Sequence, residues 1–231
     1  GQWVDADLGC SNDDYVGCDV QRGLGYAYTG DDNDEGCNGV PGYGLQPPAV
    51  GVDFFEGPYQ DLDGVDNPLT TDCNLAVAQK GIVYKGIGIG YGDGVVDNER
   101  YGMRAFLYHD NNAGVRGDPS IAIQYYNYLN GIWKDGTPNT YGGTGYTTTP
   151  GAQRAEYMFP GDSDPLGWGT ECLPQPSWTE ENSNNAAADR RFIQSAGPFT
   201  LEPGNYNNIT VGVVWARATG GGAFASVADV Q

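Results

Sequence analysis

Residues 81–100 read Gly81-Ile-Val-Tyr-Lys-Gly-Ile-Gly-Ile-Gly-Tyr-Gly-Asp-Gly-Val-Val-Asp-Asn-Glu-Arg100 and contain the two patterns on which the fold depends. The first half is apolar and rich in glycine, which predicts a strand over 81–90 that its glycines weaken or bend. The second half places three acidic side chains and an Asn around Gly94, where a tight turn favours a residue without Cβ. Short apolar runs and acidic turns alternate in the same way along the chain, which predicts a mainly β protein.

Four acidic clusters separate the apolar runs: residues 93–99, residues 61–67, the region 5–19, and residues 31–36. Oxygen-rich loops suit Ca²⁺, which takes about six to eight oxygen ligands and tolerates irregular geometry. Asp, Asn and Gly are also the commonest turn residues, so any one cluster is explained equally well as an ordinary turn. Four clusters together favour at least one Ca²⁺ site. None of them has the ligand spacing of an EF-hand.

The expected Ca²⁺ ligands are carboxylates of three of these clusters, with backbone carbonyl groups supplying the rest of each shell. In order of expectation they are Asp93, Asp97 and Glu99, then Asp61, Asp63 and Asp66, then Asp5, Asp7, Asp13 and Asp14.

The composition limits the possible partners. The chain has 30 acidic and 11 basic residues and a net charge of -19, so it lacks the clustered Lys and Arg that nucleic acids and anionic membrane surfaces require. No apolar run is long enough to cross a bilayer, and no signal-peptide pattern occurs at Gly1. We expect one β-rich domain over residues 1–231, cut from a longer secreted protein.

The five cysteines indicate disulfides. None lies in a CxxC pair, and the chain has a single His, so a zinc site is not expected. Cys10, Cys18 and Cys37 lie among acidic loops that a bridge would brace, which points to an oxidising, extracellular compartment. Because the number of cysteines is odd, one of them is free or pairs outside this segment.

Hydrophobic periodicity and turn residues locate the expected elements. A helix is expected from Asp118, as N-cap, to about residue 132, and another begins near Phe224. Residues 57–79 and 136–186 are expected to be long loops. Strands are expected at residues 2–4, 15–20, 24–28, 47–56, 81–90, 101–109, 190–195, 197–201 and 208–216, the last of them buried.

Several stretches resemble a recurrent module of large secreted and cell-surface proteins of Bacteroidota, exported by the type IX secretion system. They are Trp3-Val-Asp-Ala-Asp-Leu-Gly9, Asp13-Asp-Tyr-Val-Gly-Cys-Asp19, Pro47-Pro-Ala-Val-Gly51, Phe54-Phe-Glu-Gly-Pro58, Gly92-Asp-Gly-Val-Val-Asp-Asn-Glu-Arg100, Tyr126-Asn-Tyr-Leu-Asn-Gly-Ile-Trp-Lys134, Phe159-Pro-Gly-Asp-Ser-Asp-Pro165 and Ala188-Asp-Arg-Arg-Phe-Ile-Gln-Ser-Ala-Gly-Pro-Phe-Thr-Leu201. The resemblance covers nearly the whole chain and implies no particular reaction. It implies a parent protein with further β-domains and a C-terminal sorting domain.

We therefore expect a β-sandwich, jelly-roll-like, with long acidic loops and one or two short helices. The expected function is a non-catalytic, Ca²⁺-braced structural or adhesive module at the cell surface, whose partners are other domains of the parent protein or neighbouring subunits. The alternative is a carbohydrate-binding module that stacks extracellular glycans on exposed aromatic rings; the candidates are Trp133, Trp168, Trp178, Tyr141 and Tyr146.

A glycan-acting hydrolase is the third possibility. It would use a carboxylate pair such as Asp162 with Asp164, or Glu180 with Glu181, but thirty acidic residues produce such pairs by chance. The chain contains no Gly-x-Ser-x-Gly nucleophile elbow, and its single histidine, His109, is expected to be structural. We do not expect the chain to be an enzyme.

Overall fold

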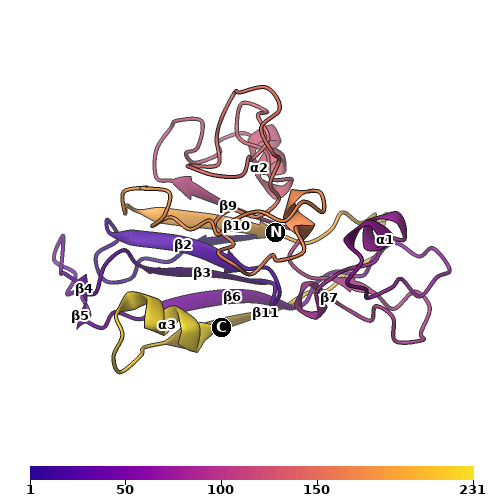
Figure 1. The fold of residues 1–231 in the computed structure, drawn as a ribbon, viewed down its shortest axis with the longest axis horizontal. Coiled ribbons are helices and arrows are strands. Elements are labelled where there is room, and N and C mark those ends of the chain that lie inside the picture. Colours follow the sequence, from indigo (N-terminus) through magenta and orange to yellow (C-terminus); the bar gives the residue numbers. More distant parts are fainter.

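The computed structural model describes residues 1–231 and shows a mainly β chain built from antiparallel sheets (Figure 1). The strands are β1 (Gln2–Asp5), β2 (Asp14–Asp19), β3 (Leu24–Thr29), β4 (Asn33–Asp34), β5 (Gly44–Leu45), β6 (Ala49–Glu56), β7 (Gly88–Ile89), β8 (Arg100–Tyr101), β9 (Ala105–Asp110), β10 (Arg190–Ser195) and β11 (Thr210–Ala216). The helices are α1 (Cys73–Ala78), α2 (Ala122–Leu129) and α3 (Ala223–Val230), and short 3₁₀ turns occupy Lys85–Ile87 and Trp168–Thr170.

Two sheets contain most of the strand residues. The larger has the strand order β11-β6-β3-β2, and the smaller has the order β1-β10-β9; every pairing in them is antiparallel. β2 and β3 form the hairpin that the sequence predicts, with Tyr26 and Tyr28 on one face. The smaller sheet joins the first residues of the chain to a strand near residue 190, so it depends on pairing between distant segments.

The two sheets contact each other through a close approach at Gly25 of β3. A Cβ atom on Gly25 would lie 2.6 Å from the Gln194 side chain and 2.8 Å from that of Phe106. The Gln194 amide donates a hydrogen bond across the gap to the Val52 carbonyl oxygen at 3.0 Å. The glycine therefore removes the volume that would hold the sheets apart, and a cluster of 27 buried apolar residues fills the space around this contact.

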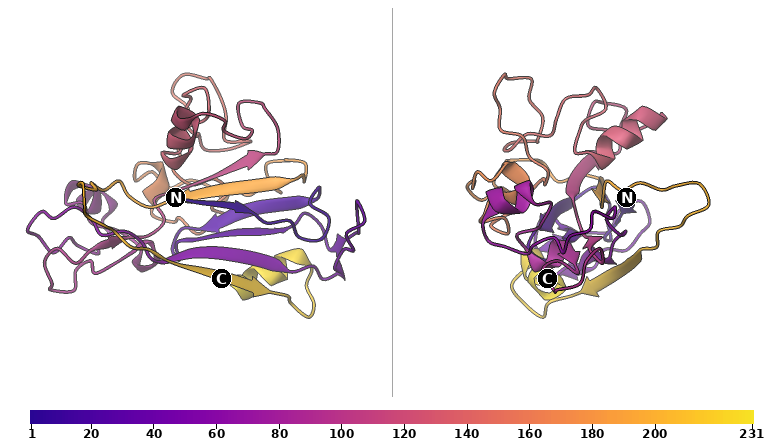
Figure 2. Two further views of the ribbon diagram at one scale, coloured as in Figure 1. Left: turned by 180° about the vertical axis from the view of Figure 1, so that it is seen from behind. Right: turned by 90° about the vertical axis from the view of Figure 1, so that its right-hand side faces the viewer.

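Helices cover the outer faces of the sheets. α3 places Val227 and Val230 over Tyr26 and Tyr28 of β3, and α2 lies against β10, with Tyr128 buried. Figures 1 and 2 show α2 and α3 on opposite sides of the strands, and residues 57–104 extending from one end. None of the three helices is long and apolar enough to cross a membrane.

Several sequence-based assignments are wrong. Residues 81–90 form a 3₁₀ turn and the two-residue β7, because Gly81 and Gly86 pack directly against backbone where a strand would need side chains. Residues 197–201 form no strand, and β9 begins only at Ala105. β11 is an edge strand with exposed Val213 and Trp215, so it is not buried.

The helices also differ from expectation. There are three, because α1 lies within the expected loop 57–79, capped by the Asp72 carboxylate, which accepts a 3.0 Å hydrogen bond from Leu75 N. α2 begins at Ala122, after Ile121, and Asp118 does not cap it. Asp118 instead pairs with Arg191 at 3.0 Å, because the strand that carries Arg191 passes next to the start of the helix. The helix expected from Phe224 is present as α3.

Two disulfides are present and confirm the prediction from the cysteines. Cys10 pairs with Cys37 across the acidic loops, and Cys73 pairs with Cys172, which ties α1 to the long loop 136–186. Cys18 is free and buried in β2, so it braces no loop. Disulfides are typical of chains that fold in non-reducing, extracellular surroundings.

Candidate functional site

The structure brings together the acidic clusters 61–67 and 93–99. Asp97 Oδ1 accepts hydrogen bonds from the backbone N–H groups of Asp63 and Gly64, at 2.7 and 2.9 Å. In return, the Asp66 carboxylate accepts hydrogen bonds from Gly92 N and Gly94 N, both at 2.8 Å. Each loop therefore supplies the carboxylate that satisfies backbone donors of the other, a pairing that local turn chemistry alone does not predict.

Other predicted ligands of these clusters also have protein partners. Asp63 pairs with Lys80 Nζ at 2.9 Å, and Asp61 accepts two hydrogen bonds from Thr200, both at 2.7 Å. The hydrogen bond from Lys80 holds the pKa of Asp63 below its usual value, and the bonds from Thr200 do the same for Asp61. Asp93 accepts from Asn98 Nδ2 at 3.0 Å, which lowers its pKa.

Glu99 is the one predicted ligand of this pair of loops that is buried, at 2 % exposure. Its Oε1 accepts a hydrogen bond from Asn67 N at 2.6 Å. The Glu99 carboxylate therefore also accepts a hydrogen bond from the backbone of the loop 61–67.

Three carboxylates do converge elsewhere. Ligand oxygens of Asp5, Asp7 and Asp189 lie within 4.8 Å of one another, and they form the only group of three or more His, Cys, Asp or Glu side chains with this geometry. The register of β1 on β10 causes the convergence: Asp5 lies opposite Arg191, so Asp189 lies two residues beyond this pairing. Asp189 was not predicted as a ligand. Its only local signal is its place directly before the strand pattern at 190–195.

Asp14, at the start of β2, is buried beside this group. Its side chain is 1 % exposed, its Oδ2 accepts a long 3.4 Å hydrogen bond from Leu8 N, and its Oδ1 has no partner. The Asp14 carbonyl oxygen accepts a hydrogen bond from Ala188 N at 3.2 Å, which places Asp14 beside the residue that precedes Asp189. Burial raises the pKa of Asp14 to about 9, with smaller contributions from Asp13 and Asp7.

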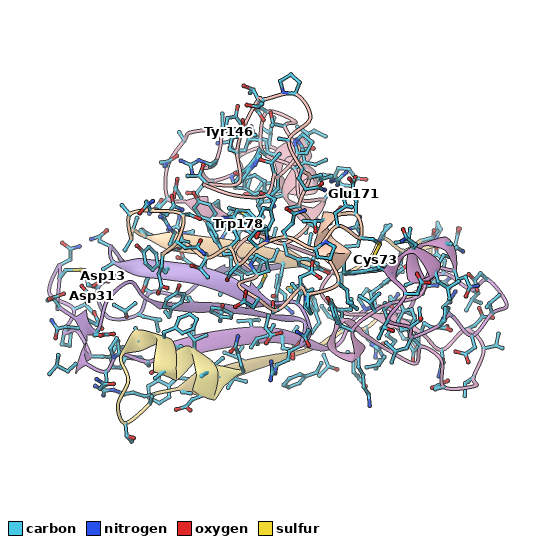
Figure 3. All side chains as sticks on the ribbon, in the orientation of Figure 1. Asp13, Asp31, Cys73, Tyr146, Glu171 and Trp178 are labelled. Carbon is cyan, nitrogen blue, oxygen red and sulfur yellow. A yellow bond between two sulfur atoms is a disulfide. The ribbon has the colours of Figure 1, made fainter.

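Asp13 shares this environment. Its Oδ1 is buried without a partner, and burial, followed by the charge of Asp34, raises its pKa to about 6. Asp34 itself is satisfied, because it accepts hydrogen bonds from Cys10 N at 3.0 Å and Tyr43 N at 2.7 Å. Figure 3 shows Asp13 and Asp31 at the end of the molecule where β4 and β5 lie.

We call Asp5, Asp7, Asp13, Asp14 and Asp189 the acidic corner. Its only cationic neighbour is Arg191, which lies 2.9 Å from Asp5 and 4.0 Å from Asp189, and which also pairs with Asp118. No ion pair reaches Asp7, Asp13 or Asp14. The acidic corner therefore gathers five carboxyl groups around a single cationic side chain, and one of these carboxyl groups, that of Asp14, lies in the interior.

The aromatic residues proposed for sugar stacking divide into two groups. Trp133 and Trp178 are 0 % and 2 % exposed, and their indole N–H groups donate to the carbonyl oxygens of Gly145 and Gly143. These two tryptophans are therefore core residues and offer no ring face to a sugar, so they do not fit the carbohydrate-binding alternative. Their burial follows from the loop 136–186, which has no regular core of its own and packs its aromatic side chains inward.

The remaining three, Tyr141, Tyr146 and Trp168, are half-buried. The Tyr146 hydroxyl donates to Asp135 at 2.9 Å, and the Tyr141 ring packs 4.9 Å from that of Trp178. Trp168 alone lines a cavity of appreciable size.

In each carboxylate pair considered for hydrolysis, one member is held by contacts within the fold. Glu180 is fully buried, pairs with Arg190 Nε at 2.9 Å and accepts from Val16 N. Asp164 accepts hydrogen bonds from the Tyr84 hydroxyl and from Trp168 N. His109 is also fully buried, with its ring centroid 4.2 Å from that of Trp3, and burial lowers its pKa to about 4.

Compared with known proteins, the chain matches no protein-family model, no curated protein and no solved structure.

Proposed function

We propose that this chain is a Ca²⁺-braced structural or adhesive module of a bacterial surface protein, in which the two main sheets pack as a β-sandwich and the acidic corner holds the ion. The observation that carries the proposal is the buried Asp14 carboxyl group, whose Oδ1 has no hydrogen-bond donor, next to three converging carboxylates.

The chemistry of the corner favours a hard cation. A carboxylate removed from water is destabilised unless a positive charge or hydrogen-bond donors compensate it, and neither is present at Asp14 Oδ1. Asp5, Asp7 and Asp189 supply oxygen ligands of the type that Ca²⁺ prefers, and irregular loops such as 6–13 can add backbone carbonyls. The donor set contains no Cys or His, which argues against Zn²⁺.

The position of the corner supports a structural role. Asp5 ends β1, Asp14 begins β2, and Asp189 directly precedes β10. β1 and β10 belong to the smaller sheet and β2 belongs to the larger, so an ion at this corner would connect the two sheets and the first strand of the chain. Such an ion would contribute binding energy to folding only where free Ca²⁺ is abundant, as it is outside cells.

An extracellular location has separate support in the two disulfides, one of which, Cys10–Cys37, bridges loops that the acidic residues occupy. The resemblance to type IX secreted modules of Bacteroidota agrees with this location. We propose that other domains of a parent surface protein, or neighbouring subunits, are the partners of the module.

The paired loops 61–67 and 93–99 are a second proposed Ca²⁺ site. Their carboxylates already accept backbone hydrogen bonds, so an ion there would use the remaining lone pairs and would add less to stability. As a proposed Ca²⁺ site, we therefore rank the acidic corner above the loop that includes Asp93, Asp97 and Glu99.

The proposal is tested by elemental analysis of the purified protein and by thermal unfolding with Ca²⁺ or with excess chelator. Bound calcium and a higher Tm with Ca²⁺ are expected, because a ligand that binds only the folded state stabilises it. The variant Asp7→Asn with Asp189→Asn should lose most of this shift. The control Asp229→Asn removes an exposed charge from α3, which contributes no residue to the corner, and should keep the shift. No bound metal and no shift in Tm would contradict the proposal.

A further inference from the structure

A cavity of about 290 Å³ opens between α1, the turn Lys85–Ile87 and the segment 101–104, on the side of the molecule away from the acidic corner. Its inner surface is apolar: Ala76, Ile82, Ile87 and Met103 line it and are all buried. The volume is close to the lower end of the range for small-molecule sites, about 300 Å³, and the mixture of an apolar floor with a few polar groups is typical of them.

Two half-buried aromatic residues, Trp168 and Tyr101, line the cavity. Trp168 is held in place through its backbone N–H, which donates to Asp164 Oδ1 at 2.8 Å. The Tyr101 hydroxyl and the Trp168 indole N–H make no hydrogen bond within the protein, so both remain available to a ligand. A third ring, Tyr91, is buried and fixed by a hydrogen bond from its hydroxyl to Gln60 at 3.0 Å.

Arg104 and Lys80 are the charged residues that line the cavity, and Lys80 is paired with Asp63. Only one of the Arg104 guanidinium nitrogens is engaged, in a 2.9 Å hydrogen bond from Nη1 to Glu156 Oε2. The other oxygen of Glu156 lies 3.2 Å from Arg154 Nη2. One carboxylate is therefore shared between two guanidinium groups, which leaves an excess positive charge at this rim of a protein with a net charge of -19.

We propose that this cavity binds an acidic saccharide, with the ring of a uronic acid residue packed against Trp168 and Tyr101 and its carboxylate on the free edge of the Arg104 guanidinium. The planar guanidinium can donate two parallel hydrogen bonds to a carboxylate. The apolar floor and aromatic walls match the C–H faces of a pyranose ring, and the Tyr101 hydroxyl and the Trp168 indole N–H match its hydroxyl groups.

The proposal is independent of the acidic corner. It uses none of the carboxylates proposed as Ca²⁺ ligands, although Lys80 at the rim pairs with Asp63. Binding is therefore measured with chelator present, so that a Ca²⁺ bridge between the sugar acid and the acidic loops does not contribute. The saccharide proposal can then be contradicted while the Ca²⁺ proposal is supported, or the saccharide proposal supported while the Ca²⁺ proposal is contradicted.

The test is isothermal titration of the folded protein with D-glucuronate, D-glucose and benzoate. We expect D-glucuronate to bind at least about tenfold more tightly than D-glucose, because each hydrogen bond to a charged group contributes about 1.5–3 kcal/mol. Benzoate tests for an aromatic acid site. If benzoate binds and D-glucuronate does not, the saccharide assignment is wrong.

Variants separate the roles of the residues. Arg104→Gln should reduce D-glucuronate affinity about tenfold and leave D-glucose binding unchanged, since it removes only the charged hydrogen bonds. The matched control Arg154→Gln changes the other partner of Glu156, which does not line the cavity, and should bind D-glucuronate like the parent protein. Trp168→Ala should weaken both sugars. Unchanged affinity in Arg104→Gln, with a Tm equal to that of the parent, would overturn the proposal, as would equal affinity for the two sugars.

Discussion

Asp5 of β1 lies opposite Arg191 of β10, with its Oδ2 atom 2.9 Å from the guanidinium Nε. This pairing aligns the first strand of the chain with a strand nearly two hundred residues away, and it brings Asp189 to Asp5 and Asp7. A shift of register by one residue would turn every side chain of β1 to the opposite face and would separate these carboxylates. The candidate cation site therefore depends on the pairing of the two ends of the fold.

Asp14→Asn should have opposite effects on stability with and without Ca²⁺. In excess chelator, the substitution removes a buried carboxyl group that lacks a partner on one oxygen, and the free energy of unfolding should rise by about 1–3 kcal/mol. With Ca²⁺ present, the variant loses a ligand and should be stabilised less than the parent. Urea unfolding under both conditions measures the two effects. Equal stabilisation of the variant and the parent by Ca²⁺ would remove Asp14 from the site.

The burial of His109 should produce acid sensitivity. Its folded-state pKa, about 4, lies below the usual histidine value of 6.5 because burial disfavours the charged imidazolium, although Asp118 opposes this effect. The unfolded chain therefore binds the proton more tightly than the folded protein does. The folded state has its full stability above the unfolded-state pKa of 6.5, and it loses stability as the pH falls from there through the folded-state pKa of about 4. The total loss is about 3 kcal/mol, and about 2 kcal/mol of it occurs by about pH 5.

His109→Phe keeps a ring against Trp3 and Tyr128 but does not titrate. The difference in unfolding free energy between about pH 7 and about pH 5 should therefore be smaller in this variant by about 2 kcal/mol. If the two proteins show the same pH dependence, the acid sensitivity arises from other groups, and the buried neutral imidazole is not its cause.

The buried pair of Glu180 and Arg190 should show strong coupling. Arg190→Met leaves the Glu180 carboxylate in the interior with hydrogen bonds only from Val16 N and Asn185, and should cost about 3–5 kcal/mol. Burial already raises the pKa of Glu180 to about 7 with Arg190 in place. The double variant Glu180→Gln with Arg190→Met should recover much of the loss, because the fully buried charge of Glu180 is then removed and only the half-buried Asp110, which also pairs with Arg190, is left without its partner. A double-mutant cycle by urea unfolding gives the coupling energy, and additive losses would mean that the pair is not coupled.

Gly25→Ala should destabilise the contact between the two sheets. The new methyl group would lie 2.6 Å from the Gln194 side chain and 2.8 Å from that of Phe106, so overpacking should cost about 1–3 kcal/mol or more. Gly220→Ala is the matched control, because a Cβ there meets no atom within 4 Å and its φ lies outside the left-handed region. The comparison of Tm values measures the effect. A loss of the same size in both variants would show that helix or strand propensity, and not the close approach, is responsible.

Several local features of this protein could be predicted from its sequence. The β2–β3 hairpin follows from two short runs with period-two patterning, β6 follows from an extended run after Pro47-Pro48, and α3 follows from its apolar spacing. The disulfides followed from the number and setting of the cysteines. Each of these depends on residues close together in the chain or on composition, and the acidic loops could be recognised for the same reason.

Which acidic and aromatic residues lie together, and which are exposed, depends on how distant segments pack. Asp189 joins Asp5 and Asp7 through the register of distant strands, and Asp97 turns to the backbone of the loop at 63–64. Trp133 and Trp178 were candidates for sugar stacking, but they pack into the core because a long loop without regular structure needs its own apolar centre. Such contacts depend on the free energy of burial summed over the whole fold, which no single stretch of sequence contains.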